Sequence, residues 1–480
     1  MTLSGDIALA LPQLILAGSA LVLLIWGAYQ GKTSALFTFA AVAALAAAAI
    51  AAAVAPVGRA FGGALISDEG AAFAQVAIFA ASAVAIPLTD RWLAQRGDQH
   101  FELAVLIILA ALGMSIMVAA GDLISLYIGI ELHSLALYIL AAFRRDDAKS
   151  SEAGLKYFVL GALSSGLLLY GASLIYGFVG SVRFTDIAAA THGGVGLGVI
   201  VGLVFVICGI AFKVSAAPFH MWTPDVYEGA PTPIVGFFAG APKLAAMALL
   251  ARLLTVGFPG AIDQWRQILI IAALLSVFVG SFAGLAQSNL KRLWAYSSIA
   301  NIGYALVGLA AGGTAGVQSM LIFMVLYTID VTGFFACLAA LQRDGRPMER
   351  FSDFAGLMKE RPGLALAITA FSLSALGLPP FSGFWAKFYV FKAALASGPL
   401  TTWAAVIALL GSVVAAFYYL RLIKVMWLDP TPGAVDRPAG GAVAVTIAYA
   451  SALFAIPVVM FVLIKLDPIA TLAAAAFVGR

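Results

Sequence analysis

The sequence has 480 residues, of which 63% are hydrophobic and only 10% are charged. Soluble domains contain about 25% charged residues, so this composition excludes an ordinary soluble domain. Apolar runs long enough to span a bilayer recur along the whole chain and predict an all-α, polytopic membrane protein. The alternating pattern of a transmembrane barrel is absent. The net charge of +4 is typical of basic cytoplasmic loops, so it does not indicate nucleic-acid binding.

The first apolar run resembles a signal peptide in length only. No Lys or Arg precedes Lys32, so the run lacks the basic start of a signal peptide and is predicted to stay as a spanning helix. Fourteen spans are predicted in chain order, at 10–28, 34–55, 72–90, 102–120, 122–143, 154–180, 196–220, 232–255, 266–287, 294–311, 316–341, 364–395, 402–427 and 441–464.

The spans are predicted to form one integral membrane domain. Residues 10–90 hold three N-terminal helices and residues 441–464 hold the last one. The stretch after Asp467 is expected to be a short interfacial helix or a tail. In the charged loop 342–363, four apolar residues share one helical face: Phe351, Phe354, Leu357 and Met358. This loop is either a short surface helix or an ordinary connector.

Basic residues fix the predicted orientation. With both termini outside, 17 Lys and Arg fall on the cytoplasmic side and seven on the outer side. This asymmetry follows the positive-inside rule and supports an even number of spans. The cytoplasmic set includes Lys32 and Arg437, and the outer set includes Arg480.

Two of the spans are interrupted by proline. Pro218 follows Lys213 in the seventh span, and Pro379 and Pro380 precede Lys387 in the twelfth. Broken helices in corresponding positions of two halves indicate an ion site at the interface of inverted repeats. The two breaks lie five spans apart, which predicts two inverted five-helix repeats, spans 4–8 in residues 102–255 and spans 9–13 in residues 266–427.

Among the ionisable residues inside predicted spans, four are the main candidates for function: Glu131, Lys213, Lys243 and Lys387. A charge at the centre of a spanning helix costs about 2.5–3.5 kcal/mol on insertion scales, so such residues are functional by default. Burial favours the neutral form of a lysine and a nearby carboxylate favours the charged form. We therefore expect Glu131 to hold Lys213 charged, and Lys213 to release its proton to Lys243 when the pair weakens. Lys387 is expected at the end of this relay.

Three further residues are weaker candidates for the same path. His220 either transfers protons or bonds a helix end, and Asp330 is either a relay acid or a hydrogen-bonded buried carboxyl. His133 lies two residues from Glu131 and therefore on another helical face. Cys208 and Cys337 have no metal-ligand spacing and are interpreted as small hydrophobic residues. The chain shows no nucleotide loop, redox ligand set or metal site, so a driven subunit is favoured over a free-standing pump.

Four segments resemble a known family. They are KVSAAPFHMWTPDVYEGAPTP at 213–233, LKYFVLGALSSGLLLYG at 155–171, NLKRLWAYSSIANIGY at 289–304 and GLPPFSGFWAKFYVF at 377–391. The first is similar to the signature of the antiporter-like subunits of respiratory complex I, a proton-pumping NADH:quinone oxidoreductase. The others resemble, more narrowly, the subunit N branch of that family in bacteria. The resemblance covers about residues 100–425.

The resemblance implies fourteen helices with two inverted repeats and proton translocation driven by electron transfer in partner subunits. It implies that Glu131 and Lys213 are the family's carboxylate–lysine pair, with Lys243 as the connecting lysine and Lys387 as the lysine of the broken twelfth helix. Sister antiporter-like subunits and membrane lipids are the implied partners in a bacterial inner membrane. NADH, flavin mononucleotide (FMN), iron–sulfur clusters and quinone are implied on partner subunits, with no cofactor in this chain. Neither Asp330 nor His133 matches a family position.

Two other functions remain open at the level of sequence. The first is a subunit of a multisubunit cation/proton antiporter, which would lack the flavin and iron–sulfur absorbance of the redox enzyme. The second is a passive membrane scaffold, in which neutral substitutions of the three buried lysines would be silent.

Overall fold

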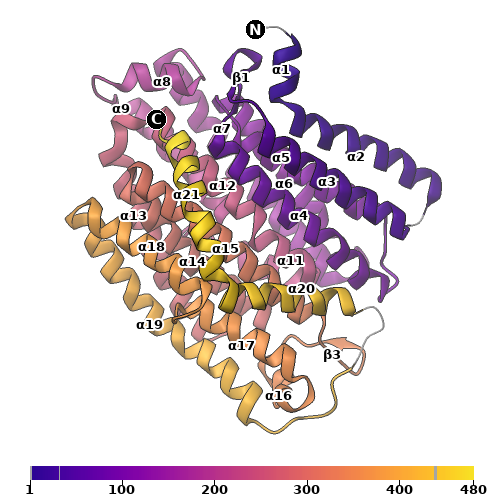
Figure 1. Ribbon diagram of the computed structural model, residues 1–480. Helices are drawn as coiled ribbons and strands as arrows, with labels where there is room; N and C mark the ends of the chain where they lie inside the picture. The colour runs from indigo at the N-terminus through magenta and orange to yellow at the C-terminus, as the bar shows by residue number, and fades with distance from the viewer. Residues whose placement is uncertain (1–2, 32, 437–440, 480) are drawn as a thin grey trace.

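The protein is a bundle of helices, seen in a computed structural model that describes residues 3–31, 33–436 and 441–479 (Figure 1). Twelve helices in the described part are long and apolar enough to cross a membrane, and three shorter apolar helices accompany them. In hydrocarbon a helix satisfies its own backbone hydrogen bonds, and apolar runs of this length therefore fold as helices. The all-α polytopic class is confirmed, whereas the count of fourteen spans stays a prediction. Lys32, Arg437 and Arg480 lie outside the described residues.

The helices follow the predicted spans closely in the first half of the chain. The bounds are α1 Leu3–Leu9, α2 Leu11–Gln30, α3 Ala35–Val54, α4 Glu69–Ala94, α5 Glu102–Val118, α6 Leu123–Ala141, α7 Ala148–Val179, α8 Phe184–Thr191, α9 Leu197–Val214, α10 Thr223–Gly229, α11 Thr232–Ala239 and α12 Ala241–Arg252.

The second half continues in the same way. The bounds are α13 Ile262–Leu285, α14 Leu290–Ala311, α15 Gly313–Ala339, α16 Leu357–Glu360, α17 Pro362–Leu376, α18 Ser382–Ser397, α19 Pro399–Leu428, α20 Ala442–Leu453 and α21 Val459–Phe477. The last helical stretch runs well past the predicted end at 464. Helix α21 continues through Lys465, Asp467 and Pro468 to Phe477. A tail after Asp467 was therefore wrong.

Two small hairpins lie in the loops. Strand β1 Gly58–Ala60 pairs antiparallel with β2 Leu65–Ser67, and β3 Gln342–Arg343 with β4 Arg346–Pro347. After the second hairpin the chain forms a 3-10 turn, Phe351–Phe354, and the one-turn helix α16. The apolar residues of this segment face the protein, since Phe351, Phe354 and Leu357 are buried. It is a packed connector and not one continuous surface helix.

Both predicted helix breaks are present, and a third accompanies them. Helix α9 ends at Val214 before a turn that leads to α10, and residues 377–381 separate α17 from α18. The additional break is at Gly240, between α11 and α12. This break falls inside the predicted span 232–255, at the sequence Gly-Ala-Pro of residues 240–242. Pro242 has no backbone N–H, so it cannot donate the hydrogen bond that a continuous helix needs at this position.

Glycines bring several helices into backbone contact. A Cβ atom on Gly113 of α5 would lie 2.4 Å from the backbone nitrogen of His133 on α6. A Cβ atom on Gly280 of α13 would lie 2.4 Å from the Tyr296 carbonyl oxygen on α14. Small residues allow this close approach. In lipid the hydrophobic effect does not drive helices together, so the van der Waals contacts made at short range stabilise their association. The pairs α5–α6 and α13–α14 are thus packed in the same manner.

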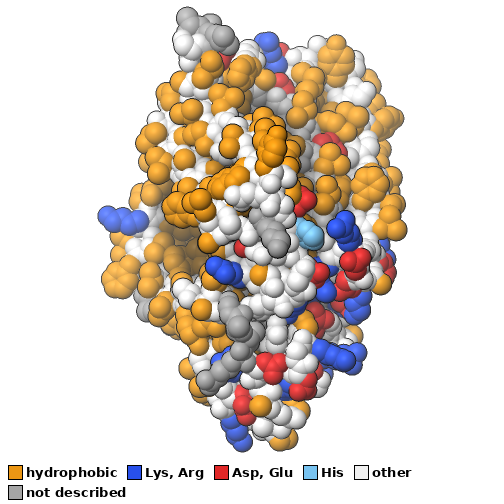
Figure 2. Space-filling view, turned by 90° about the vertical axis from the view of Figure 1, so that its right-hand side faces the viewer, with side chains coloured by type: hydrophobic (Ala, Val, Ile, Leu, Met, Phe, Trp, Pro, Cys, Tyr) orange, Lys and Arg blue, Asp and Glu red, His pale blue; other side chains and the backbone are white. Residues whose placement is uncertain are grey.

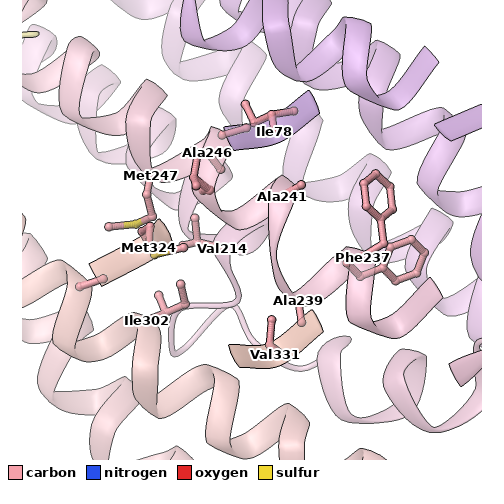
Figure 3. Close-up of a cluster of buried hydrophobic side chains, with 14 of the residues drawn as sticks. Ile78, Val214, Phe237, Ala239, Ala241, Ala246, Met247, Ile302, Met324 and Val331 are labelled. Atoms are coloured by element: carbon pink, nitrogen blue, oxygen red, sulfur yellow. The ribbon is translucent and has the colours of Figure 1, made fainter. Parts of the chain in front are cut away.

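The interior is apolar where the two halves meet. Figure 3 shows Ile78 of α4, Val214 of α9, Met247 of α12, Ile302 of α14 and Met324 of α15 gathered in one cluster. All five side chains are fully buried. The outer surface differs by region, since Figure 2 shows hydrophobic side chains over most of one face and charged ones gathered at its lower end. An apolar belt above a charged end is the pattern of a membrane-embedded bundle.

Candidate functional site

Lys213 lies in the last turn of α9, directly before the first break. Its side chain is 3% exposed, and its Nζ donates to Ser134 Oγ at 2.9 Å and to Tyr138 Oη at 3.3 Å. Both acceptors belong to α6, so the break in α9 points the ammonium group at the neighbouring helix. The Tyr138 ring also faces the charge, 5.7 Å from its centroid. Neutral hydroxyls thus solvate this lysine.

Glu131 occupies the same helix one turn before Ser134. No direct ion pair joins it to Lys213 in the described part of the chain, and its Oε1 is buried without a hydrogen-bond partner. The residue as a whole is half-buried, while Ile128 and Leu135 beside it are 52% and 50% exposed. The expected pair is therefore not in contact, although Lys213 on α9 donates to Ser134 of α6, one turn after Glu131. His133 faces inward, toward Gly113 of α5, as its separate helical face predicted.

Lys243 lies three residues after the break at Gly240 and is fully buried. Its Nζ donates to Ser298 Oγ of α14 at 2.7 Å. Tyr327 of α15 donates to the same Ser298 oxygen, also at 2.7 Å. Lys243 therefore connects the first half of the chain to two helices of the second half through one hydroxyl group.

Lys387 lies on α18, directly after the second break. Its Nζ donates to the carbonyl oxygens of Ala375 at 3.1 Å and Leu376 at 2.9 Å, at the end of α17. The broken helix leaves these carbonyls without intrahelical partners, and the negative end of a helix favours a cation. Ser412 of α19 accepts a third hydrogen bond at 3.0 Å, and the Tyr304 ring lies 4.4 Å away. The break thus forms the binding place of the lysine.

Asp330 of α15 lies at the other side of the same break. Its carboxylate accepts hydrogen bonds from Ser374 at 2.5 Å and from Ser382 at 2.8 Å. Ser374 belongs to α17 and Ser382 begins α18, so the carboxylate bridges the two halves of the broken helix. A cavity of about 20 Å³ beside it is also lined by Tyr327 and Asn301. This volume is enough for one water molecule.

His220 lies in the turn after the first break, where Pro218 is exposed and His220 is half-buried. Its Nδ1 is buried and has no hydrogen-bond partner. Within the described residues, His220 forms no hydrogen bond with Lys213, Lys243 or Lys387. Among those residues, no three His, Cys, Asp or Glu side chains gather as metal ligands do.

Outside the membrane spans, an ion-pair network covers the charged end below Lys213. Asp225 of α10 accepts from Lys156 of α7 at 2.7 Å and from Arg292 of α14 at 2.6 Å. Glu228 pairs with Lys149 and with the same arginine, each at 3.2 Å. Burial raises the pKa of Asp225, but the bonds from Lys156 and Arg292 outweigh it and hold that pKa below its usual value. These ion pairs tie α10 to α7 and α14.

Sequence reasoning assigned no role to the hydroxyl groups that join the buried charges. Ser134, Ser298, Ser374 and Ser412 each contact a buried lysine or Asp330, yet a serine in a spanning helix usually bonds its own backbone. Nothing in their local sequence sets them apart. Only the packing of the helices brings them to the charged groups.

Comparison with protein families gives a match over most of the site. The model of the family described as "NADH:quinone oxidoreductase/Mrp antiporter, TM" matches residues 120–413, which hold all four main candidates. The NADH-quinone oxidoreductase subunit N of Caulobacter sp. (strain K31) is 70% identical over 99% of each chain. That of Rhodospirillum rubrum is 48% identical over 90% of each.

Solved structures agree with these relatives. A chain of respiratory complex I from Thermus thermophilus with bound aureothin is 32% identical, with a TM-score of 0.77 over 92% of this chain and 96% of that one. A chain of an archaeal membrane-bound sulfane sulfur reductase is 27% identical, with a TM-score of 0.84 over 99% and 98%. A chain of the Mrp complex from Dietzia sp. is 21% identical with a TM-score of 0.82 over 100% and 98%, a likeness of fold alone.

Proposed function

The chain belongs to the NADH:quinone oxidoreductase/Mrp antiporter transmembrane family, and on that premise we propose that it is the proton-translocating subunit N of a bacterial NADH:quinone oxidoreductase. The observation that carries this proposal is the shared geometry of three buried lysines. Each of Lys213, Lys243 and Lys387 ends on a serine hydroxyl inside the bundle. A hydroxyl both donates and accepts, so it can take a proton from an ammonium group and pass one on.

The relay begins at Glu131 and Lys213. Because no direct ion pair holds Lys213 among the described residues, its charge depends on hydroxyls that also solvate the neutral amine. A change in the charge of Glu131, one turn away on α6, then shifts the proton affinity of Lys213. His220, beside the break in α9, is the proposed access group on this side.

The relay continues from Lys243 to Lys387 through Asp330. Ser298 and Tyr327 lead from Lys243 to the cavity of about 20 Å³ that Asp330 also lines. One water there would need polar partners, and Tyr327, Asn301 and Asp330 supply them. Asp330 and Lys387 hold opposite sides of the same helix break. A proton at Asp330 is therefore separated from Lys387 only by the residues of the break between α17 and α18, which hydrogen-bond to both groups.

The energy for transport comes from partner subunits. Moving one charge against 100 mV costs about 2.3 kcal/mol, which electron transfer from NADH to quinone supplies. We assign FMN, the iron–sulfur clusters, NADH and quinone to those partners and no cofactor to this chain. Relatives of this chain are subunits of multisubunit complexes, so other membrane subunits are expected beside it.

The position of Glu131 supports a sister subunit as neighbour. It is half-buried on a helix whose outer residues Ile124, Ile128, Leu135 and Ile139 are all exposed. A carboxylate facing lipid is costly, whereas one facing another protein is not. We therefore place an antiporter-like sister subunit over this face of α6.

The arrangement in the membrane follows from the charged end of the bundle. The hairpin that begins with β3 lies at the end of the bundle opposite to α1 and to the C-terminal end of α21 (Figure 1). Lys149 and Arg292 line one charged cavity together with Arg343 and Arg346 of this hairpin. With that basic end in the cytoplasm, both termini face the periplasm of a bacterial inner membrane. The matching glycine contacts in α5–α6 and α13–α14 support the division into repeats at 102–255 and 266–427.

The test is Lys213→Ala in the intact complex, with proton pumping and NADH:quinone reductase activity measured in vesicles. We expect pumping to be abolished or sharply reduced. The matched control is Lys359→Ala, because Lys359 is exposed on α16. Normal pumping by an assembled Lys213→Ala complex would overturn the relay. Absence of flavin and iron–sulfur absorbance from the purified complex would favour a cation/proton antiporter instead, and silent neutral substitutions at all three lysines would favour a scaffold.

A further inference from the structure

A charged cavity of about 890 Å³ opens at the basic end of the bundle, apart from the buried lysines. It lies where the end of α13, the start of α14 and the hairpin β3–β4 meet. Its charged lining residues are Lys149, Glu228, Arg292, Arg343, Asp344, Arg346, Glu349, Arg350 and Asp353.

Most acids of this cavity already have partners. Glu228 pairs with Lys149 and Arg292, and Glu349 pairs with Lys291 at 3.3 Å. Asp353 accepts the backbone N–H groups of Glu349 and Arg350. Asp344, in the exposed turn of the hairpin, is at the rim. The acids therefore do not neutralise the arginines of the hairpin.

Arg343 forms no ion pair with any of the residues that the structure describes. Its Nε and Nη2 atoms are both buried and have no hydrogen-bond partner, although the residue lines the cavity. Arg346, the first residue of β4, is exposed and forms no ion pair within the described residues. Buried donors normally find acceptors, so a guanidinium group with two open N–H sites indicates a missing anion. The fork of N–H groups fits the oxygens of a phosphate or a carboxylate.

The surface next to the cavity points to lipid as the source of that anion. Helix α13 exposes Ile271, Leu275 and Phe282 by 61%, 43% and 55%, and Ala286 follows Phe282 one turn later. Ala286 itself lines the cavity. An apolar strip thus runs along α13 and ends at the charged opening, as an acyl chain and its headgroup would require. A free ion or a soluble ligand would need no such strip.

We propose that this cavity binds the phosphate group of an anionic phospholipid, with Arg343 as its main ligand and Arg346 as a second cation. The acyl chains lie along α13 over Phe282. Basic pockets between spanning helices on the cytoplasmic side hold such headgroups. The proposal does not depend on the proton relay, since none of its residues belongs to that path.

The test uses the purified complex that contains the full chain, delipidated and titrated with phosphatidylglycerol, with bound lipid counted by native mass spectrometry. Arg343→Gln should lose one bound phosphatidylglycerol per complex, or bind it at least about tenfold more weakly, because a charged hydrogen-bond partner is removed. The matched control is Arg145→Gln, an exposed arginine at the same end but outside the cavity. It should bind phosphatidylglycerol as the parent complex does.

Two further arms separate lipid from other anions. Phe282→Ala removes apolar surface without touching the cavity, so it should weaken phosphatidylglycerol binding even if Arg343→Gln fails to assemble. Inorganic phosphate should compete poorly with the lipid; full displacement at millimolar concentration would retain the phosphate site but reject lipid as its source. Equal lipid binding by the parent, Arg343→Gln and Phe282→Ala complexes would overturn the proposal. If the Arg343→Gln complex lost a partner subunit while its lipid content stayed unchanged, the proposal would also be overturned. That result would assign the cavity to a contact with another protein.

Discussion

Lys243 and Tyr327 meet on one hydroxyl group, because both donate to Ser298 Oγ, each at 2.7 Å. A serine oxygen accepts two hydrogen bonds and donates one, so both of its acceptor sites are filled here. When Lys243 loses its proton, its amine becomes an acceptor and Ser298 can turn to donate to it. The hydroxyl is therefore a reversible contact between the first half of the chain and α15.

Removing this hydroxyl with Ser298→Ala should slow proton transfer at Lys243. A hydrogen bond to a charged group contributes about 1.5–3 kcal/mol, so we expect proton pumping to fall roughly 10-fold or more while the complex still assembles. Pumping by reconstituted vesicles, compared with subunit content, measures the effect. Ser372→Ala is the control, since Ser372 is equally buried and, within the part of the chain that the structure describes, its hydroxyl donates only to the Ile368 carbonyl of its own helix. Equal pumping by the two variants would remove Ser298 from the path.

Asp330 offers a test that separates charge from shape. Asp330→Asn keeps the size of the group, and its amide oxygen still accepts from one of the two serines, Ser374 or Ser382. We expect this variant to assemble and to pump poorly if the carboxylate carries protons. Asp330→Leu removes every acceptor and should also destabilise the break, by about 1–3 kcal/mol for each serine hydroxyl left unpaired. Thermal unfolding of both complexes, with pumping measured in parallel, gives the two effects. Full pumping by Asp330→Asn would leave this residue a purely structural role.

The contact between α13 and α14 predicts a packing defect. Gly280→Ala places a Cβ atom 2.4 Å from the Tyr296 carbonyl oxygen, so the helices must separate. Overpacking of this kind costs about 1–3 kcal/mol, and we expect a lower melting temperature and less assembled complex. Gly166→Ala on α7 is the matched control, because nothing lies within 4 Å of its added Cβ. Equal melting temperatures would mean that α13 and α14 tolerate a wider spacing.

The sequence predicted which residues are charged inside the membrane but not what they touch. Apolar length and the two proline breaks located Lys213 and Lys387 correctly in broken helices. The break before Lys243 was missed, because a single Gly-Ala-Pro inside an apolar run also occurs in continuous helices. The half-exposed position of Glu131 could not be read from its helix, which is apolar on all sides. The pairing of Lys243 with Ser298 depends on helices far apart in the chain, and periodicity carries no information about such contacts.

The buried ion pair between Arg252 and Asp68 leads to a prediction that depends on pH. Arg252 is 1% exposed, and its two terminal nitrogens each lie 2.7 Å from an Asp68 oxygen, at the end of the bundle opposite to the cavity. Burial raises the pKa of Asp68, but the charge and hydrogen bonds of Arg252 outweigh it, so that pKa lies below 3.8 in the folded protein. The carboxylate thus stabilises the fold fully above its unfolded pKa, and this stabilisation is lost as the pH falls through the lowered value.

Asp68→Asn should therefore destabilise the protein most near neutral pH. Leaving the buried guanidinium unpaired costs about 3–5 kcal/mol there. The difference from the parent should begin to shrink as the pH falls below 3.8, because the Asp68 carboxylate of the unfolded parent then binds a proton that the folded parent, with its lowered pKa, does not. Unfolding of the purified complex, followed from about pH 7 to about pH 3, measures both the loss of stability near neutral pH and its decrease at low pH. Asp263→Asn is the control, since its carboxylate is 81% exposed and lies 4.0 Å from Arg266, where an ion pair contributes little. A difference between Asp68→Asn and the parent that stays constant over this range would show that the ionised carboxylate is not what holds Arg252 in place.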